Sequence, residues 1–454
     1  MDKQPLTPTD SSSDATAEPS RRKFIKGSSM LLAGGAIAAH NTSVARGAHA
    51  YGSDRIKIGL VGCGGRGRGA AIQALNTDGG EVRLVAMADA FDYQLEDALK
   101  TIQGQHPDKV EVSKDNQFTG LEAYQGVMAS DCDLVILATP PGFRPLHFDT
   151  AINAGKHVFM EKPVATDVAG VRRVLEVGKL AEEKGLAVQV GLQRHHEERY
   201  KEIVERVHNG EIGDIVTARA YWNGGGVWVR PRRPEQTELA YQTFNWYYFN
   251  WLCGDHINEQ HIHNLDVINW VMKGYPVQAQ GQGGREVRKG PDHGQIFDHH
   301  MIEYTYEGAH NPKMFSQCRH IRGCWNQVAE HVSGTKGFAD LSGAKLYDNS
   351  GKLLFKSNGS GGGHQQEHHD LFADLRAGKL PNETEYGAKS TMTAILGRMA
   401  TYSGKVVTWD EAMESNQSLA DFDSLKSFDQ EAPIQPDADG NYDVPVPGKT
   451  KPYV

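Results

Sequence analysis

Hydrophobic and polar positions alternate in two different ways along this chain, and the change falls near residue 194. From residue 54 to 193, short apolar and β-branched runs alternate with amphipathic stretches. We predict strands at 57–62, 82–89, 133–139, 157–161 and 187–193, and helices at 64–76 and 165–184. Continuous apolar strands that alternate with helices are typical of a parallel, doubly wound sheet.

The second pattern consists of longer runs in which apolar and polar residues alternate, as is typical of antiparallel strands with one face in water. These runs lie at 214–222, 299–308, 313–321 and 326–334, and helices are predicted at 258–274, 364–377 and 385–403. We therefore predict an α/β domain over 54–193 and a second α/β domain with a large, mainly antiparallel open sheet over 194–425. Residues 426–454, rich in Pro and Asp, are expected to form an extended tail.

The first fifty residues carry a different signal. An arginine pair, Arg21 and Arg22, is followed by a Gly- and Ala-rich apolar stretch over 27–39 and by Ala-His-Ala at 48–50. The apolar stretch is about half as long as a bilayer-spanning helix. These features are typical of a twin-arginine targeting peptide, which we predict for residues 1–50. We expect a periplasmic protein that is exported folded and has no membrane anchor after processing.

The composition excludes one class of partner. The formal net charge is -9, so the chain lacks the positive surface that nucleic-acid binding needs. The five cysteines include no Cys-x-x-Cys pair. We interpret them as small buried residues, with a disulfide between Cys318 and Cys324 as the alternative. The partner is expected to be a small molecule.

A glycine-rich loop follows the first predicted strand and opens the first predicted helix. Gly62, Gly64 and Gly67 have the G-x-G-x-x-G spacing of a dinucleotide-binding loop. Gly62 would form the tight turn, Gly64 would let the backbone approach a pyrophosphate, and Gly67 would let helix and strand pack closely. The phosphates would lie at the helix N-terminus. The predicted cofactor-binding loop comprises Gly62, Cys63, Gly64, Gly65, Arg66 and Gly67.

The residue at the end of the second predicted strand bears on which dinucleotide binds. Asp89 could accept hydrogen bonds from ribose hydroxyls and would repel a 2′-phosphate, which favours NAD. Arg66 and Arg68 argue for NADP, which is the alternative cofactor.

Two more motifs end strands of the same predicted sheet. The run "ATPPGFR" (138–144) would form a rigid floor where open α/β sheets bind ligands, and "MEKP" (160–163) places a lysine at the crevice. That lysine could hold a sugar hydroxyl or relay a proton. A plain turn and a solvated lysine are the alternatives. From these strand ends we predict cofactor contacts for Thr139, Pro140, Pro141, Glu161 and Lys162.

One predicted helix carries a carboxylate and histidines. Glu259 and His263 are four residues apart and would share a face, with His256 one turn earlier. A carboxylate beside an imidazole raises its basicity, which suits a base that removes a hydroxyl proton. We predict Lys162, His263, Glu259 and His256 as catalytic. The alternatives are a partly buried polar helix and a metal site of His256, His261 and His263; the spacing differs from H-E-x-x-H, and we predict no metal.

Aromatic residues crowd the stretches 221–228 and 244–251. Tyr221 and Trp222 could form a wall of a sugar site, because the C–H faces of a pyranose stack on flat rings. Core or interface packing is the alternative interpretation.

Together, "GLVGCGGRG", the acid after the second strand, "ATPP", "EKP" and a helix with E-x-x-x-H-x-x-D resemble the glucose–fructose oxidoreductase/inositol dehydrogenase (Gfo/Idh/MocA) family over about residues 54–425. The resemblance implies an NAD(P)-binding Rossmann domain, a second α/β domain on a large open sheet, and a homodimer or homotetramer. It implies that Lys162 and His263 occupy the reactive positions. Glu259 stands where the family usually has Asp.

The resemblance also implies a function. The expected activity is NAD-dependent oxidation or reduction of a CH–OH group in a sugar or sugar derivative. Gln193 and Arg194 match positions near the nicotinamide or substrate; we predict Gln193 toward the cofactor. Predicted substrate contacts are Arg194, Tyr221, Trp222 and His256. An exported enzyme of this kind would hold its cofactor tightly and complete a redox-neutral cycle.

Two other functions stay open from the sequence. The family includes NAD-dependent α-N-acetylgalactosaminidases, which cleave glycosides by transient oxidation and also carry twin-arginine leaders. His256 lies ten residues before Asp266, as a histidine does in them, but "CGDHI" replaces their Y-P-T-H-G. The other alternative is a non-catalytic sugar-binding protein on the same fold.

Overall fold

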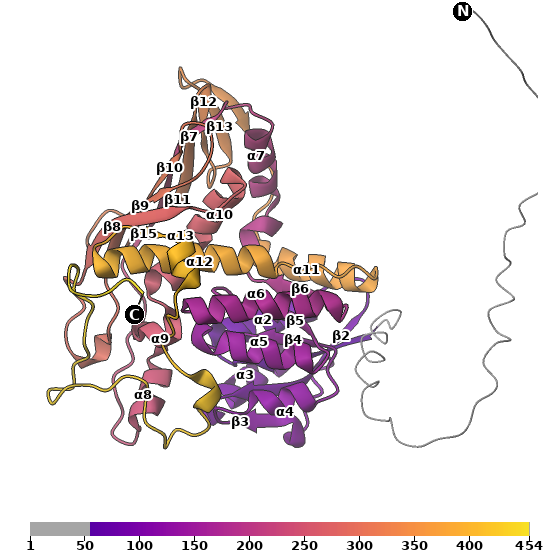
Figure 1. Cartoon of the computed structure of the whole chain (residues 1–454). Coiled ribbons are helices and arrows are strands. Elements are labelled where there is room, and N and C mark those ends of the chain that lie inside the picture. The colour runs from indigo at the N-terminus through magenta and orange to yellow at the C-terminus, as the bar shows by residue number, and fades with distance from the viewer. Residues whose placement is uncertain (1–54, 454) are drawn as a thin grey trace, which may run out of the picture. The chain divides into compact units, whose positions relative to one another are not determined.

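The computed structural model describes residues 55–453, and Figure 1 shows the arrangement of their elements. The predicted targeting peptide, residues 1–50, lies outside the described residues. Within the described residues, a first sheet contains six parallel strands in the order β3-β2-β1-β4-β5-β6. They are β1 (Arg55–Val61), β2 (Glu81–Asp89), β3 (Gln117–Thr119), β4 (Leu134–Leu137), β5 (His157–Met160) and β6 (Val188–Val190).

Helices cover both faces of this sheet. Alternate side chains of one strand enter opposite cores: Leu134 and Ile136 pack with α2 and α3, whereas Val135 and Leu137 pack with α4, α5 and α6. This explains why the strands are apolar without interruption. The predicted doubly wound α/β domain is confirmed. Its helices are α2 (Gly65–Leu75), α3 (Asp92–Gln105), α4 (Tyr124–Ala129), α5 (Arg144–Asn153) and α6 (Val168–Glu183).

The second sheet contains nine strands in the part of the chain that the structure describes, in the order β14-β13-β12-β11-β7-β10-β9-β8-β15. Only β7 and β10 pair in parallel there, so the predicted large, mainly antiparallel sheet is confirmed. The strands are β7 (Ile215–Gly224), β8 (Gln278–Gly284), β9 (His299–Thr305), β10 (Lys313–His320), β11 (Gln327–Gly334), β12 (Gly337–Asp340), β13 (Lys345–Asp348), β14 (Leu353–Lys356) and β15 (Val407–Thr408).

Helices α10 and α12 pack against one face of the second sheet, here called the inner face, and α11 packs against α2 of the first domain (Figure 1). The helices that follow β6 are α7 (Glu198–His208), α8 (Glu238–Phe244), α9 (Asn250–Cys253), α10 (Ile262–Met272), α11 (Gly363–Arg376), α12 (Thr384–Ser403) and α13 (Trp409–Glu414). The segment after α13 contains neither helix nor strand over residues 426–453.

The helix predicted over 258–274 begins with an unexpected geometry. Residues Ile257–His261 form a π-helical turn, and the α-helical part, α10, follows from Ile262. A π turn bonds residues five apart instead of four, so it rotates the side chains before it relative to those after it. The four-residue spacing of Glu259 and His263 therefore does not place the two side chains on one face, as it would in an α-helix.

Two further features are the state of the cysteines and the hydropathy of the helices. All five cysteines are free thiols, and Cys324 is exposed while the other four are buried. The interpretation as five buried residues is therefore wrong for Cys324. Over residues 55–453, no helix combines the length and apolarity that crossing a bilayer requires.

Candidate functional site

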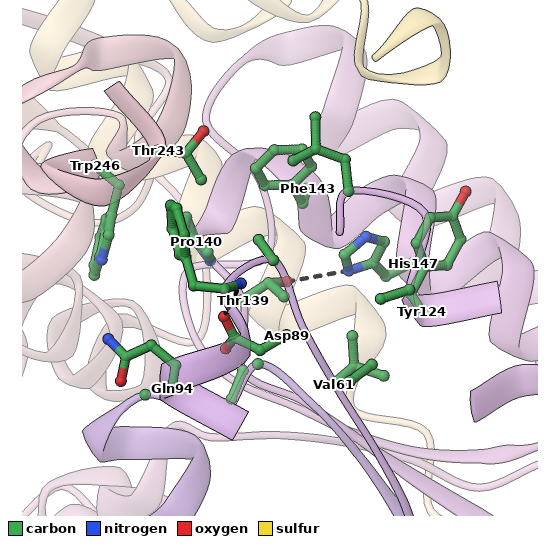
Figure 2. Close-up of a pocket in the computed structure, with 18 of the residues that line it drawn as sticks. Val61, Asp89, Gln94, Tyr124, Thr139, Pro140, Phe143, His147, Thr243 and Trp246 are labelled. Atoms are coloured by element: carbon green, nitrogen blue, oxygen red, sulfur yellow. Dashed lines mark hydrogen bonds between the residues drawn. The ribbon is translucent and has the colours of Figure 1, made fainter. Parts of the chain in front are cut away.

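A cavity of about 310 Å³ lies at the carboxyl ends of β1, β2 and β4, where the strand order of the first sheet changes direction (Figure 2). Open α/β sheets bind ligands at this switch point. The glycine loop, Asp89, Thr139 and Pro140 line the cavity, and His147 lies at its inner end. Of the predicted cofactor contacts, Cys63, Gly67, Pro141, Glu161, Lys162 and Gln193 do not line this cavity.

The glycines of this loop fall into two pairs: in one pair a side chain would clash with the protein backbone, and in the other a side chain would extend into open space. Gly62 has φ +96°, and a Cβ on it would lie 2.5 Å from the backbone nitrogen of Thr139. A Cβ on Gly67 would lie 1.8 Å from the carbonyl oxygen of Gly62. For Gly64 and Gly65, no atom of the described chain lies within 4 Å of such a Cβ. The first pair packs the loop, and the open space at the second pair fits a pyrophosphate against the start of α2.

Asp89 is joined to the glycine loop. Its carboxylate accepts hydrogen bonds from the backbone nitrogens of Cys63, at 2.6 Å, and of Phe91, at 2.9 Å. Burial raises the pKa of Asp89, while these hydrogen bonds and the charge of Arg230 oppose the rise. The carboxylate thus lies at the cavity wall where a ribose of a dinucleotide would bind.

Arg66 and Arg68, which favoured NADP in the sequence, have partners within the protein. The guanidinium of Arg66 forms an ion pair with Glu161 and lies 3.4 Å from the carboxylate of Glu367. Nη1 of Arg68 donates to the hydroxyl of Thr101 at 3.4 Å. Since Glu161 binds Arg66 instead of facing the cavity, its predicted contact with a cofactor is indirect. The charge of Arg66 is already balanced, which weakens the argument for a 2′-phosphate.

Below the cavity, a buried arginine joins two turns that carry predicted site residues. Arg144 donates to the carbonyl of Pro163 at 2.5 Å and also to the carbonyl of Thr139. The hydroxyl of Thr139 bonds Nδ1 of His147 at 3.1 Å. Burial lowers the pKa of Arg144 to about 10 and that of His147 to about 3. Arg144 therefore keeps its charge at neutral pH and fixes the turn beside Lys162.

Lys162 and Glu259 come together across the two domains. Nζ of Lys162 donates to the carbonyl oxygen of Glu259 and lies 3.3 Å from its carboxylate. Burial raises the pKa of Glu259, and the charge of Lys162 acts against that rise. The prediction that both residues belong to one site agrees with this contact, but their pairing with each other was not predicted.

His263 lies on the inner face of the second sheet. Its ring stacks on Trp222 of β7, with centroids 6.0 Å apart, and its Nδ1 is buried without a hydrogen-bond partner in the described structure. Burial and the nearby charge of Lys162 lower the pKa of His263 well below its ordinary value. The predicted pair of Glu259 and His263 does not form, because the π turn rotates Glu259 toward Lys162.

His256 is fully buried and belongs to a separate cluster. Its Nδ1 lies 2.7 Å from a carboxylate oxygen of Asp255, whose other oxygen lies 3.3 Å from Nε2 of His300. These three side chains could by composition hold a metal ion. However, Arg288 lies in the same cluster, with its guanidinium 2.8 Å from Nδ1 of His320, and its charge would repel a cation. The alternative metal set is not assembled, because Nε2 of His261 instead bonds Ser316 at 2.7 Å.

Two predicted substrate residues point elsewhere. Neighbouring side chains of a strand lie on opposite faces, so Tyr221 leaves Trp222 and contacts Trp325 on the outer face of the sheet, with ring centroids 5.6 Å apart. Arg194 forms an ion pair with the buried carboxylate of Glu330, which also accepts from the hydroxyl of Tyr200 at 3.0 Å. Tyr221 is therefore corrected as a substrate contact, and Arg194 is occupied by Glu330.

Sequence reasoning missed two side chains beside the Lys162 site. The hydroxyl of Tyr247 is buried and unpaired within residues 55–453, and the charge of Glu259 contributes to raising the pKa of this phenol, after burial. His364, at the start of α11, lies near Arg66 and Lys162, whose charges help burial to lower its pKa. The aromatic run 244–251 was a signal for Tyr247, whereas nothing local marks His364.

Comparisons with known proteins agree with this fold. Residues 56–192 match the family model of the Gfo/Idh/MocA oxidoreductases, described as an oxidoreductase family with an NAD-binding Rossmann fold. Inositol 2-dehydrogenase of Burkholderia lata is 27% identical over 52% of this chain and 60% of its own length. That of Agrobacterium fabrum is 29% identical over 50% and 56%. The chain thus spans less than two thirds of the length of these relatives.

Solved structures show the same fold over more of the chain. An aldose-aldose oxidoreductase from Caulobacter crescentus, complexed with glycerol, superimposes with a TM-score of 0.60 at 17% identity, over 78% of this chain and 99% of its own. A myo-inositol 2-dehydrogenase from Lactobacillus plantarum gives 0.58 at 22% identity, again over 78% and 99%. Both resemblances concern the fold. Over residues 56–192, this chain is similar to the NAD-binding Rossmann domain of the Gfo/Idh/MocA oxidoreductases.

Proposed function

We propose that the protein is an NAD-dependent oxidoreductase that acts on a CH–OH group of a sugar or sugar derivative. One observation carries the proposal: the dinucleotide-type cavity and the contact of Lys162 with Glu259 adjoin two neighbouring turns, and Arg144 binds a carbonyl in each. The family of the Rossmann domain and the inositol dehydrogenases among its relatives support it.

In this reaction, different groups would handle the hydride, the proton and the substrate ring. A bound nicotinamide would accept or return the hydride. The ammonium of Lys162, held by Glu259, would donate a hydrogen bond to the reacting oxygen of the substrate and stabilise negative charge on it. His263 stays neutral at physiological pH, because its pKa is lowered, so an unpaired ring nitrogen can accept a proton from a hydroxyl. Trp222 beneath His263 offers a flat apolar surface for the C–H face of a ring.

The test uses substitutions in these two positions. Lys162→Met and His263→Ala should each lower kcat/KM on a panel of inositols and aldoses by about 10²–10⁴-fold, because each removes a proton-handling group. Lys156→Met is the control: Lys156 is buried and binds the carbonyls of Ser130 and Cys132, and none of these three residues lines the cavity. Full kcat/KM in both site variants would refute the roles of Lys162 and His263. Absence of turnover by the wild-type protein on the whole panel would instead favour a non-catalytic sugar-binding protein.

We also propose that residues 1–50 direct export of the folded protein to the periplasm with its cofactor already bound. The support is the arginine pair and the cleavage-like sequence, together with a cofactor pocket in the domain that follows. Replacing Arg21 and Arg22 by Lys should leave the protein in the cytoplasm, as cell fractionation would show. A periplasmic location of that variant would refute the proposal.

A homo-oligomer is a further proposal for this chain. The outer face of the second sheet carries exposed apolar side chains, among them Met301, Trp325 and Phe338. Large apolar side chains exposed on a sheet face are typical of contact surfaces. Light scattering during gel filtration should give a mass of two or four chains, and a monomer would refute it.

A further inference from the structure

One wall of the cavity comes from outside the Rossmann domain. Residues 225–249, here called the flap, follow β7 and include α8. From the flap, Trp228, Arg230, Thr243 and Trp246 line the cavity; Figure 2 shows Thr243 and Trp246 facing Pro140 and Gln94 across it. A ligand at the carboxyl end of β2 is therefore enclosed by both domains.

Arg230 is the charged residue of the flap in this wall. Its guanidinium carbon lies 4.0 Å from the ring centroid of Trp228 and 5.0 Å from that of Phe244, and its Nη1 donates to the carbonyl of Phe244 at 2.7 Å. The backbone nitrogen of Arg230 donates to the side chain of Asn245 at 3.0 Å. The guanidinium plane is thus fixed beside Asp89 with donors to spare, as a surface for a flat, polar ring.

A second segment holds the flap against the Rossmann domain. Residues 417–443, here called the strap, begin on the Rossmann side: the carboxylate of Asp423 lies 2.6 Å from the guanidinium of Arg173. The strap then passes over the cavity wall, where Phe428 stacks on Phe91 with centroids 5.2 Å apart and planes 16° apart. Phe91 itself lines the cavity next to Asp89.

The strap continues along the back of the flap. The hydroxyl of Thr237 donates to the carbonyl of Phe428 at 2.6 Å, and the amide of Gln242 donates to that of Ile434 at 2.6 Å. Farther on, the hydroxyl of Tyr442 donates to the carboxylate of Glu238 at 2.6 Å. The flap can move away from Asp89 only if it breaks these bonds or if the strap leaves Arg173 and Phe91 of the Rossmann domain.

We propose that Arg230 is a cofactor-binding residue for the adenosine half of the dinucleotide, and that the strap keeps the flap closed so that the cofactor stays bound between turnovers. The proposal rests on the dinucleotide pocket of the proposed function but not on its sugar substrate. The proposal assigns retention of the cofactor to the second domain and the strap, in addition to the binding that the Rossmann domain provides. A retained cofactor is what an exported redox-neutral enzyme requires.

The experiment measures release of NAD from the loaded protein. Holoprotein is filled with isotopically labelled NAD and diluted into unlabelled NAD, and mass spectrometry follows the label that stays bound. Arg230→Ala should release the label about tenfold faster, from the lost stacking and charge. Phe428→Ala should have a similar effect, since it loosens the wall behind Phe91.

Matched controls separate the proposal from general damage. Arg233→Ala removes a flap arginine outside the cavity, and Tyr453→Ala removes an aromatic residue after the strap, whose hydroxyl bonds Glu411 at 2.9 Å. Both should release NAD at the wild-type rate. Tyr442→Phe deletes the bond between the strap and Glu238 while it keeps the ring, and it should accelerate release even where Phe428→Ala does not fold.

Two outcomes would overturn the inference. One is wild-type protein that exchanges NAD as fast as the variants; the other is an effect of Arg230→Ala on NADP alone, which would assign the arginine to a 2′-phosphate. Retention of NAD by a protein that oxidises no sugar would instead refute the proposed substrate class and leave the proposed role of the strap standing. The release rate thus tests the retention of NAD, and turnover tests the substrate class, independently of each other.

Discussion

At the scale of single residues, the glycines of the cofactor loop separate packing from ligand binding. Gly67 touches the carbonyl of Gly62, whereas Gly64 faces open space in a conformation, φ -65° and ψ -177°, that alanine also adopts. The same substitution at the two positions should therefore have opposite consequences. One should affect the fold and the other should affect the ligand.

Gly67→Ala should lower the free energy of unfolding of the apoprotein by at least about 1–3 kcal/mol, because its Cβ overlaps the Gly62 carbonyl. Gly64→Ala should change that free energy by less than about 0.5 kcal/mol and weaken NAD binding at least about tenfold. Urea unfolding and calorimetric titration with NAD measure the two quantities. Unchanged NAD affinity in Gly64→Ala would show that the phosphates lie elsewhere.

The sequence predicted which residues lie in one site better than it predicted their partners. Lys162, Glu259 and His263 were singled out from local motifs, and the structure brings Lys162 and Glu259 into contact. The partner of each side chain is set by residues far away in the chain, which a local spacing cannot supply. Arg194 illustrates this, because its buried partner Glu330 is 136 positions distant.

At the scale of elements, the site depends on two turns at the ends of β4 and β5. Arg144 binds a carbonyl in each, so that a single side chain sets the position of Thr139 relative to Lys162. The sequence run "ATPPGFR" contains Arg144, but its role was not predicted, since burial of an arginine is unusual without partners.

Arg144→Met should leave these two carbonyls unsatisfied, at about 1–3 kcal/mol each, and should weaken NAD binding because the turn after β4 loses its support. Arg172→Met is the matched control: Arg172 donates to the carbonyls of Met413 and Ser415, both at 2.6 Å, away from the cavity. It should cost similar stability without a change in NAD affinity. Equal NAD affinities in the two variants would refute the role of Arg144.

The elements themselves followed from periodicity, with one instructive exception. Strands of both sheets were predicted from their hydrophobic patterns. A strand that is buried on both faces is apolar without interruption, whereas a strand that is buried on one face alternates apolar and polar residues. The π turn before α10 left no such pattern, because its residues are as buried as an α-helical turn would be. The sequence likewise left open which face of the sheet each of Tyr221 and Trp222 occupies. Alternation along a strand shows that the two side chains lie on opposite faces, but it does not show which of those faces packs against α10.

At the scale of the whole molecule, buried histidines make stability depend on acid. Burial lowers the pKa values of His147 and His261 to about 3 and of His157 and His256 to about 4, from 6.5. Below pH 6.5 the unfolded chain takes up protons that the folded chain does not. The stability that neutral histidines provide is therefore present above pH 6.5 and is lost as the pH falls toward the folded pKa values.

We expect the free energy of unfolding to fall by about 1.4 kcal/mol per pH unit for each such histidine between about pH 6.5 and 4. Urea unfolding across this range would measure the slope. His157→Gln should reduce the slope by about one histidine's share, because the pKa of this buried imidazole is lowered to about 4. A slope unaffected by His157→Gln would show that His157 does not contribute to acid unfolding.

The sequence by itself determined the two kinds of sheet and the glycine loop with its acid, and it predicted the candidate reactive positions on a turn and a helix. These rest on local spacing and on hydrophobic periodicity, which act between residues near each other in the chain. Only the tertiary structure decided that Lys162 pairs with Glu259, that Arg66 is neutralised, and that residues 225–249 and 417–443 enclose the cavity. These contacts depend on where separate segments meet as the core packs, and no local pattern encodes that.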